Sequence, residues 1–293
     1  AALQSFGRYL AFGLIALPLA WLDRARLAKL TRADWLEAGK LALVGNIVYC
    51  LFLASSIQRA GAPLPTMIIG TLPVVIAITS NLRDAQRDGR LPWLRLLPSL
   101  LLIGAGIALV NHAELDLLRA AADADADAGA HALGAMLAVG AVACWTWYPL
   151  RNADWLRHHP GRSPGTWATA QGIATLPLAV IGYALFWGWT SVSGDAFAMP
   201  FGPRPAEFIG LMLVIGLLAS WLGTLCWNEA SQRLPTTLVG QLIVFETLSA
   251  LTYAFMLRGE EPAPTTLAGI ALLVAGVLWA LRVRPQPVVV HTA

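Results

Sequence analysis

One acidic residue, Glu246, lies in the middle of a long apolar stretch of the sequence. The stretch covers residues 236–257, which is 22 residues, and a helix of about 20 mostly apolar residues is long enough to cross a bilayer. A charged carboxylate at the centre of such a helix costs roughly 3 kcal/mol, so it is normally neutralised, paired or in contact with water. Glu246 is therefore either a fixed contact between two helices or a group that exchanges a proton or binds a substrate.

Further polar and aromatic residues recur at helical spacing inside other apolar stretches. Side chains three or four residues apart share one face of a helix, whereas Gln241 lies five residues from Glu246 and is turned about 140° away from it. These faces could line a wet cavity, or they could form hydrogen bonds between helices worth about 0.6–2 kcal/mol each. The candidate cavity-lining residues are Asn46, Tyr49, Thr71, Pro73, Trp145, Tyr148, Gln171, Ser220, Thr224, Trp227, Gln241, Glu246 and Tyr253.

Pro73 lies in the middle of the apolar stretch 64–82. It has no N–H group to donate to the carbonyl of Ile69, so a kink or a free backbone acceptor is predicted there. Such a position could contact a substrate, because transporter sites lie beside interrupted helices near the bilayer midplane. An ordinary proline kink without substrate contact is the alternative.

The composition is that of a membrane protein that crosses the bilayer many times. Hydrophobic residues make up 57% of the chain and charged residues 13%, with a mean hydropathy of +0.63, whereas soluble domains carry about 25% charged residues. Only helices and closed barrels can span lipid, so we predict an all-α polytopic protein in a lipid bilayer, with no nucleic acid partner. The nine candidate spans are 6–22, 38–58, 64–82, 96–113, 131–150, 165–189, 207–228, 236–257 and 264–283.

The basic residues alternate between the connections that join these spans. Of the 20 Lys and Arg residues, 15 fall on the side that carries residues 24–32 and 83–95, and the other five are Arg8, Arg59, Arg119, Arg204 and Arg258. An excess of Lys and Arg marks the cytoplasmic side. We therefore predict a bacterial-type inner (plasma) membrane protein with Ala1 outside and Ala293 in the cytoplasm.

A weak duplication divides the sequence into two halves. Residues 17–20 (LPLA) recur as 176–179, and the triplet 105–107 (AGI) resembles 275–277 (AGV). The matches pair spans one to four with spans six to nine in order, and paired spans cross in opposite directions. This is the inverted-topology repeat of many transporters. The predicted organisation is a first repeat at 1–113, an external acidic loop at 114–130, a second repeat at 131–283 and a cytoplasmic tail at 284–293.

The fifth span, 131–150, has no partner in this pairing. Its partner is expected to precede residue 1, which predicts nine spans here of a ten-helix protein. The acidic loop contains Asp123, Asp125 and Asp127, but the glycine and glutamate of a calcium loop are absent at the required positions. A solvated loop and no metal site are therefore expected.

The sequence resembles the ten-helix EamA-type exporters of the drug/metabolite transporter superfamily. The resemblance lies in Phe245-Glu246, the following pair Gly259-Glu260, the small-residue stretch 267–279, the triplet 72–74 (LPV) and the triplet 104–106 (GAG), with Arg8 near the start of a helix. Thr247 stands where the family usually has proline, so a break after Glu246 remains open. The resemblance implies two five-helix repeats around a central cavity and export of small metabolites, amino acids or drugs.

The function expected from these features is secondary transport, in particular export of small metabolites such as aromatic or other apolar amino acids by alternating access. The expected partners are a small-molecule substrate and a coupling proton at Glu246, without a cofactor, and the oligomeric state stays open. A membrane scaffold or receptor without transport is the alternative. An intramembrane enzyme is a weaker one, since the spans contain no HExxH, GxSxG or paired-aspartate motif.

Two further groups of residues suggest where the helices meet the bilayer surface and one another. Tryptophans near span ends are typical interface anchors, and small residues allow close approach of helices. The expected anchors are Trp21, Trp35, Trp155, Trp187 and Trp189. The expected close-packing residues are Gly104, Gly106, Ala275 and Gly276.

Overall fold

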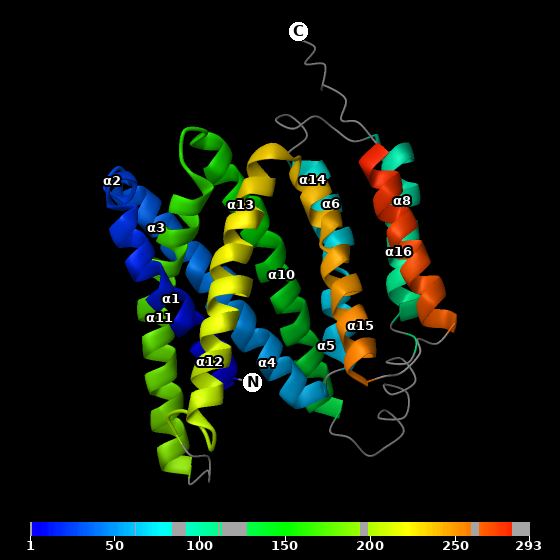
Figure 1. Cartoon of the computed structure of the whole chain (residues 1–293). Helices are drawn as coiled ribbons and strands as arrows, with labels where there is room; N and C mark the ends of the chain where they lie inside the picture. The colour runs from blue at the N-terminus through cyan, green and yellow to red at the C-terminus, as the bar shows by residue number, and fades with distance from the viewer. Residues whose placement is uncertain are drawn as a thin grey trace. The chain divides into compact units, whose positions relative to one another are not determined.

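The computed structural model describes residues 2–61, 63–83, 92–110, 112, 128–193, 199–258 and 264–282, and every regular element in these ranges is a helix (Figure 1). This confirms the predicted all-α fold. Residues 114–127 of the predicted acidic loop, the pair Gly259-Glu260 and the tail 284–293 lie outside the described residues.

The chain forms two compact units that do not follow the predicted halves of the sequence. The first unit contains residues 1–54 and 147–233, and the second contains residues 55–146 and 234–293. The division falls within two helices, α4 (Tyr49–Ala60) and α10 (Ala128–His158), each of which contributes residues to both units. Each unit therefore combines segments from both predicted repeats.

The first unit contains two π-helical segments in addition to its α-helices. One of them, η1, continues α3 into α4, and the other, η2, joins α12 to α13. The elements of this unit, besides its parts of α4 and α10, are α1 (Ala2–Leu22), α2 (Arg24–Leu27), α3 (Arg32–Leu41), η1 (Ala42–Val48), α11 (Pro164–Ser193), α12 (Pro205–Ile215), η2 (Gly216–Leu222) and α13 (Gly223–Arg233).

The second unit contains two interrupted helices. Its elements, besides its parts of α4 and α10, are α5 (Pro63–Gly70), α6 (Leu72–Arg83), α8 (Trp93–Val110), α14 (Thr236–Leu242), α15 (Val244–Arg258) and α16 (Pro264–Arg282). The first interruption separates α5 from α6 at Thr71 and agrees with the kink predicted near Pro73. The second separates α14 from α15 at Ile243, where neither proline nor glycine is present.

Eight of the nine predicted spans are found as helices long and apolar enough to cross a membrane in the described part of the chain. The exception is the stretch 236–257, for which a continuous helix was expected. Around Ile243 backbone hydrogen bonds join residues three apart, as in a 3₁₀ turn: Ile243 N donates to Gly240 O at 3.3 Å and Glu246 N donates to Ile243 O at 2.9 Å. The prediction of one unbroken span is therefore wrong at this point, because the apolar pattern does not reveal a local tightening of the helix.

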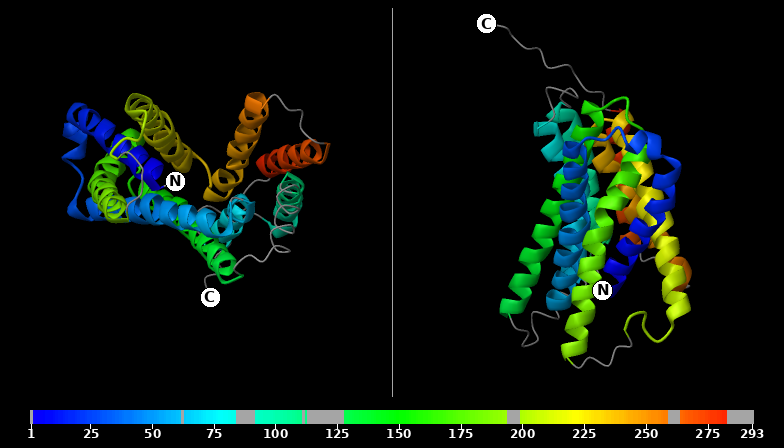
Figure 2. Two further views of the ribbon diagram at one scale, coloured as in Figure 1. Left: turned by 90° about the horizontal axis from the view of Figure 1, so that it is seen from below. Right: turned by 90° about the vertical axis from the view of Figure 1, so that its left-hand side faces the viewer.

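Helices that the predicted repeat relates to one another pack as neighbours. In the first unit α1 lies along α11, and in the second unit α6 lies along α14 and α8 along α16 (Figures 1 and 2). These are the pairs of spans one and six, three and eight, and four and nine. Their packing favours the inverted repeat and explains why each compact unit contains both halves of the sequence.

Glycines at equivalent positions of the repeat allow α8 and α16 to approach closely. A Cβ atom on Gly106 would lie 2.8 Å from the Gly269 carbonyl oxygen, and one on Gly276 would lie 2.7 Å from Ile103 Cγ1. Real Cβ atoms do not approach this closely, so only glycine fits at either position. The other two expected packing residues differ, since Gly104 has no atom within 4 Å of its Cβ position and Ala275 is exposed.

Candidate functional site

A network of buried polar side chains runs through the first unit. Tyr148 of α10 donates its hydroxyl proton to Gln171 Oε1 at 2.9 Å, and Gln171 Nε2 donates to Asn152 Oδ1 at 3.0 Å. Asn152 Nδ2 in turn donates to Asn228 Oδ1 of α13 at 2.8 Å. Tyr148 and Gln171 were predicted to line a cavity. In the structure they form hydrogen bonds with each other and, through Gln171, with Asn152, and these bonds join helices together.

Asn46 extends this network into η1. Its Nδ2 atom donates to Thr175 Oγ1 at 3.1 Å, and the Thr175 hydroxyl donates to the Gln171 carbonyl oxygen at 2.7 Å. Thr175 is fully buried, while Asn46 is partly exposed. Asn46 is thus the member of the network that keeps access to the surface of the unit.

A charged cluster lies beside the same helices, where α3 begins and α10 ends. Thr31 and Asp34 form a capping box at the start of α3, and Trp155 Nε1 donates to Asp34 Oδ1 at 2.9 Å. Glu37 accepts two hydrogen bonds from Arg151, at 2.5 Å from Nε and 3.1 Å from Nη2. These residues border an open hollow of about 410 Å³.

Trp155 is not the interface anchor that was expected. Its side chain is 7% exposed, and its ring stacks on Trp167 with a centroid distance of 3.5 Å. The indole of Trp167 donates to Asn152 Oδ1 at 2.9 Å. The ring stack therefore connects the charged cluster to the buried polar network, which explains why Trp155 lies in the interior.

Three basic connections of the first unit lie together at one end. Arg162 Nη2 donates to the carbonyl of Lys29 at 2.6 Å, and Gln232 Nε2 donates to the carbonyl of Arg162 at 3.1 Å. Arg157 Nε also donates to the carbonyl of Ser231 at 3.2 Å. The loops that follow α1, α10 and α13 are therefore on one side, as the alternation of charge predicts for them.

Arg8 of α1 contributes a positive charge within the first apolar helix. Its Nε atom donates to Ser220 Oγ of η2 at 2.9 Å, and its Cζ atom lies 5.4 Å from the centroid of the Tyr9 ring. Ser220 was predicted to line a cavity, and it is buried here at 3% exposure.

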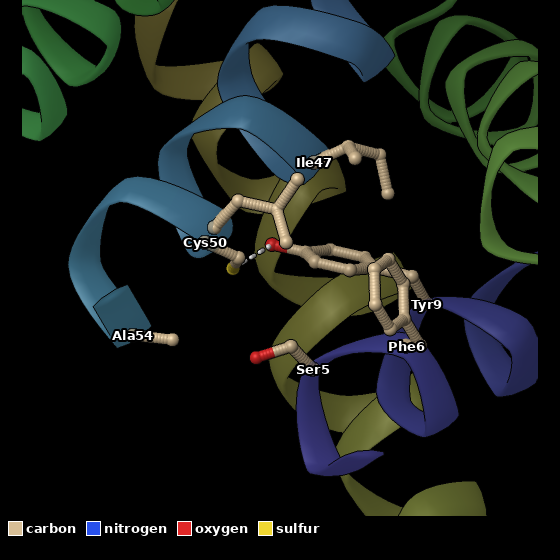
Figure 3. A pocket seen from close by; sticks show the side chains of 7 residues that line it. Ser5, Phe6, Tyr9, Ile47, Cys50 and Ala54 are labelled. Atoms are coloured by element: carbon tan, nitrogen blue, oxygen red, sulfur yellow. Dashed lines mark hydrogen bonds between the residues drawn. The ribbon is translucent and has the colours of Figure 1, made fainter. Parts of the chain in front are cut away.

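Next to Tyr9 is a small apolar hollow between α1, η1 and α4, with room for about one water molecule. Ser5, Phe6, Ile47 and Ala54 border it, and the Tyr9 hydroxyl lies 3.4 Å from Cys50 Sγ (Figure 3). Its size excludes a metabolite, so this hollow is not a substrate site.

In the second unit Gln241 joins three helices. Its Nε2 atom donates to Ser99 Oγ of α8 at 3.3 Å, and the Ser99 hydroxyl donates to the Gly276 carbonyl of α16 at 2.9 Å. Gln241 is 1% exposed, and its Oε1 atom has no hydrogen-bond partner among the residues that the structure describes. Gln241 was predicted to line a cavity or bind a substrate, and that role remains a prediction, since its contacts in the structure are contacts between helices.

The other predicted residues of α5 and α6 lie at the helix break. The hydroxyl of Thr71 donates to the carbonyl of Ile68 at 2.7 Å, which satisfies a backbone group at the end of α5. Thr71 is exposed, and Pro73 is buried in the first turn of α6. Proline is well tolerated there, because the first N–H groups of a helix have no partner within it.

Glu246 and Tyr253 are exposed on α15, and 65% of the Tyr253 side chain is accessible. The break at Ile243 separates α14, most of whose residues are buried, from α15. The predicted part of Glu246 in transport remains a prediction. Glu246 lies in the first turn of α15, about midway along residues 236–258.

The remaining candidates are partly buried: Tyr49, Trp145, Thr224 and Trp227. Trp145 packs against an apolar cluster of the second unit around Ile76 and Val142. Their role as cavity-lining residues remains a prediction. Among the described residues, no group of three or more His, Cys, Asp or Glu side chains is placed to hold a metal ion.

Sequence reasoning missed several residues that the structure places in the polar interior. Asn152 lies in a stretch that was assigned to a connection, Asn228 is the last residue of the predicted span 207–228, and Trp167 was not singled out. Asp34 and Glu37 precede the predicted span 38–58. Their polarity next to a long apolar stretch was the available signal, but only the register between α3, α10 and α13 identifies their partners.

Comparison with known proteins gives one similar sequence and a similar fold. No family model matches the chain. The inner membrane protein YtfF of Escherichia coli (strain K12) is 54% identical over 286 residues, which cover 98% of this chain and 88% of that protein. A solved structure described only as "Crystal structure of protein" aligns with a TM-score of 0.65 and 17% identity, covering 95% of this chain and 86% of that one. At this identity the second likeness concerns the fold alone.

Proposed function

The chain belongs to the family of the inner membrane protein YtfF of Escherichia coli, and from this membership and its charged residues within apolar helices we propose that it is a secondary transporter of the inner membrane. We further propose that it is a member of the drug/metabolite transporter superfamily of the EamA type, which exports small metabolites such as aromatic or other apolar amino acids. The cytoplasmic side is the side of the basic connections after α1, α10 and α13.

The observation that carries the proposal is the position of Glu246. This carboxyl group is exposed about midway along an apolar stretch that is long enough to span a bilayer. A charged group facing lipid at that depth would cost about 2.5–3.5 kcal/mol. We therefore infer that Glu246 faces a water-filled path or is protonated, and both states suit a site that couples solute movement to a proton.

The two helix breaks support the same proposal. They interrupt α5–α6 at Thr71 and α14–α15 at Ile243, and these helices correspond to each other in the predicted repeat. Substrate and ion sites of transporters with inverted repeats are built around discontinuous helices at equivalent positions. A membrane scaffold or receptor has no physical need for breaks at equivalent positions of a repeat, or for the Glu246 carboxyl group beside one of them.

The test is solute flux in proteoliposomes of the purified protein. Vesicles are loaded with a mixture of the common amino acids, and efflux of each compound is followed with and without an inward proton gradient. We expect efflux of one or more apolar amino acids above the rate of protein-free vesicles. Equal rates in both kinds of vesicle for all compounds would favour the scaffold or receptor instead.

A further inference from the structure

Arg8 is a cation in a part of the structure that is otherwise apolar. It lies in the second turn of α1, whose 20-residue span has a mean hydropathy of 1.4. Charged side chains inside apolar spans are costly, and when they are retained they mark ion or substrate pathways or pair with another group. Arg8 therefore needs either a partner of opposite charge or a function that uses its charge.

The direction of the Arg8 side chain is the opposite of that expected for a structural arginine near a helix end. Long basic side chains in that position normally extend outward to the polar headgroups. Here a Cβ atom on Gly7 would meet the side chains of Phe208 and Met212, and one on Gly216, further along the second helix, would meet Ala11. The two helices thus run parallel, and the guanidinium of Arg8 reaches ahead along them to Ser220.

Ser220 lies about midway along the 29-residue span Pro205–Arg233. The hydrogen bond of 2.9 Å from Arg8 Nε to Ser220 Oγ consequently directs the guanidinium toward the middle of the membrane. Ser220 is in the π-helical segment η2, and π-helical turns inside α-helices are rare and frequent at functional sites. The helix geometry at Ser220 is a second, independent indication that this position has a role beyond packing.

No anion neutralises the charge of Arg8 in the part of the chain that the structure describes. No carboxylate oxygen there lies within 4.0 Å of its guanidinium nitrogens, and the guanidinium contacts the neutral Ser220 hydroxyl and the Tyr9 ring at 5.4 Å. Neither of these removes the need for a counter-charge. Arg8 is also partly exposed.

Tyr9 and Ser220 both contact the guanidinium of Arg8. Tyr9 is 4% exposed, and its hydroxyl lies against Cys50 Sγ (Figure 3), so its ring has little freedom to move. With Nε used by Ser220, the two terminal NH₂ groups keep the planar fork that matches a carboxylate with two parallel hydrogen bonds.

We propose that Arg8 binds the carboxylate group of the transported solute, and that the substrates are therefore small organic carboxylates. This inference rests on the proposed transport function and specifies its substrate class. Ser220 is a positioning residue in this account, because it orients the guanidinium without contacting the solute. A phospholipid phosphate could offer similar chemistry, but its headgroup lies at the membrane surface and not near the level of Ser220.

The direct test is protection of Arg8 from an arginine-specific reagent. The wild-type protein in an uncharged maltoside detergent is treated with phenylglyoxal, and modification of Arg8 is followed by peptide mass spectrometry. The probe is benzoate, and benzyl alcohol is its uncharged counterpart. Arg204 is the internal control, because its side chain is 77% exposed and pairs with Glu207 on the surface.

We expect benzoate at saturation to slow modification of Arg8 by at least about threefold, since protection grows as one plus the ratio of ligand to its dissociation constant. Benzyl alcohol should not slow it, and Arg204 should react equally in all samples. Equal rates with both probes would overturn the inference. So would an Arg8 that does not react while Arg204 does, or protection by added phosphatidylglycerol but not by benzoate.

The result separates this inference from the transport proposal. Flux of a solute in proteoliposomes without carboxylate protection of Arg8 would refute the inference and leave transport intact. Protection without flux of any solute would do the reverse. A folded Arg8→Gln variant has no guanidinium at this site to react with phenylglyoxal, and it should lower the flux of carboxylates by about tenfold or more. Arg8→Lys should retain part of the flux, since it keeps the charge but loses the planar fork.

Discussion

The hydroxyl group of Tyr148 donates a hydrogen bond of 2.9 Å to Gln171 Oε1, and both side chains are buried between α10 and α11. This pair was expected to face a cavity. Its partners show instead that a polar network within the first unit holds helices together. We therefore propose solute contacts at two charged groups outside this network, Arg8 and Glu246.

Tyr148→Phe should destabilise the protein by about 1–2 kcal/mol, because it leaves the buried Gln171 Oε1 atom without this donor. The measurement is the midpoint of thermal unfolding in detergent. Tyr253→Phe is the matched control, since Tyr253 is 65% exposed, and it should leave the midpoint unchanged. A similar midpoint for both variants would show that the Tyr148 hydrogen bond contributes little.

Gly106→Ala should destabilise the contact between α8 and α16 by about 1–3 kcal/mol, because its methyl group would lie 2.8 Å from the Gly269 oxygen. Gly104→Ala, two residues away on α8, meets no atom within 4 Å. The second change should be neutral or stabilise the helix by up to about 1 kcal/mol, since alanine favours helix more than glycine. Unfolding midpoints that do not differ between the two variants would contradict the observed packing.

Asp34→Asn should weaken the start of α3 and the position of Trp155. The carboxylate accepts hydrogen bonds from Thr31 N and Oγ1 through one oxygen and from Trp155 Nε1 through the other. An amide has one acceptor oxygen, so at least one of these donors loses its partner, at a cost of about 1–3 kcal/mol. We expect a lower unfolding midpoint, whereas Glu207→Gln, an exposed change at the start of α12, should have no effect. An unaltered midpoint for Asp34→Asn would indicate that the capping box is dispensable.

The orientation in the membrane is tested by labelling single cysteines. In a variant without Cys50, Cys144 and Cys226, cysteine replaces either Arg26 or Arg204, whose side chains are 68% and 77% exposed. A membrane-impermeant maleimide should label the Arg204→Cys variant in intact cells and the Arg26→Cys variant only after permeabilisation, because basic connections lie in the cytoplasm. The reverse pattern would invert the proposed orientation.

The helices of this fold could be predicted from sequence, because each apolar stretch has the length that a bilayer requires. The kink at Pro73 could also be predicted, since proline lacks the N–H group that a continuous helix needs. The break at Ile243 could not, because no proline or glycine stands there and the apolar pattern continues through it. Glu246 lies in the first turn after that break, a position near a helix start that the sequence did not reveal.

The polar partners could be predicted only in part. Asn46, Tyr148 and Gln171 are polar residues within apolar stretches and were recognised as such. Their contacts with Thr175 and Asn152 depend on the register between helices. Asn46, for example, lies 129 residues from its partner Thr175 in the sequence. Helical periodicity identifies a face of a helix but not the residue that lies opposite it.

The most direct test of the account is the pH dependence of solute efflux from proteoliposomes for the wild type and Glu246→Gln. The substitution keeps the size and hydrogen bonding of the side chain but removes its titration. We expect efflux by the wild type to vary between about pH 5 and about pH 8, and efflux by Glu246→Gln to be lower by about tenfold or more and independent of pH. A folded Glu246→Gln variant with the rate and pH profile of the wild type would contradict proton coupling at Glu246, and the same outcome for Glu246→Ala would remove this residue from the transport site.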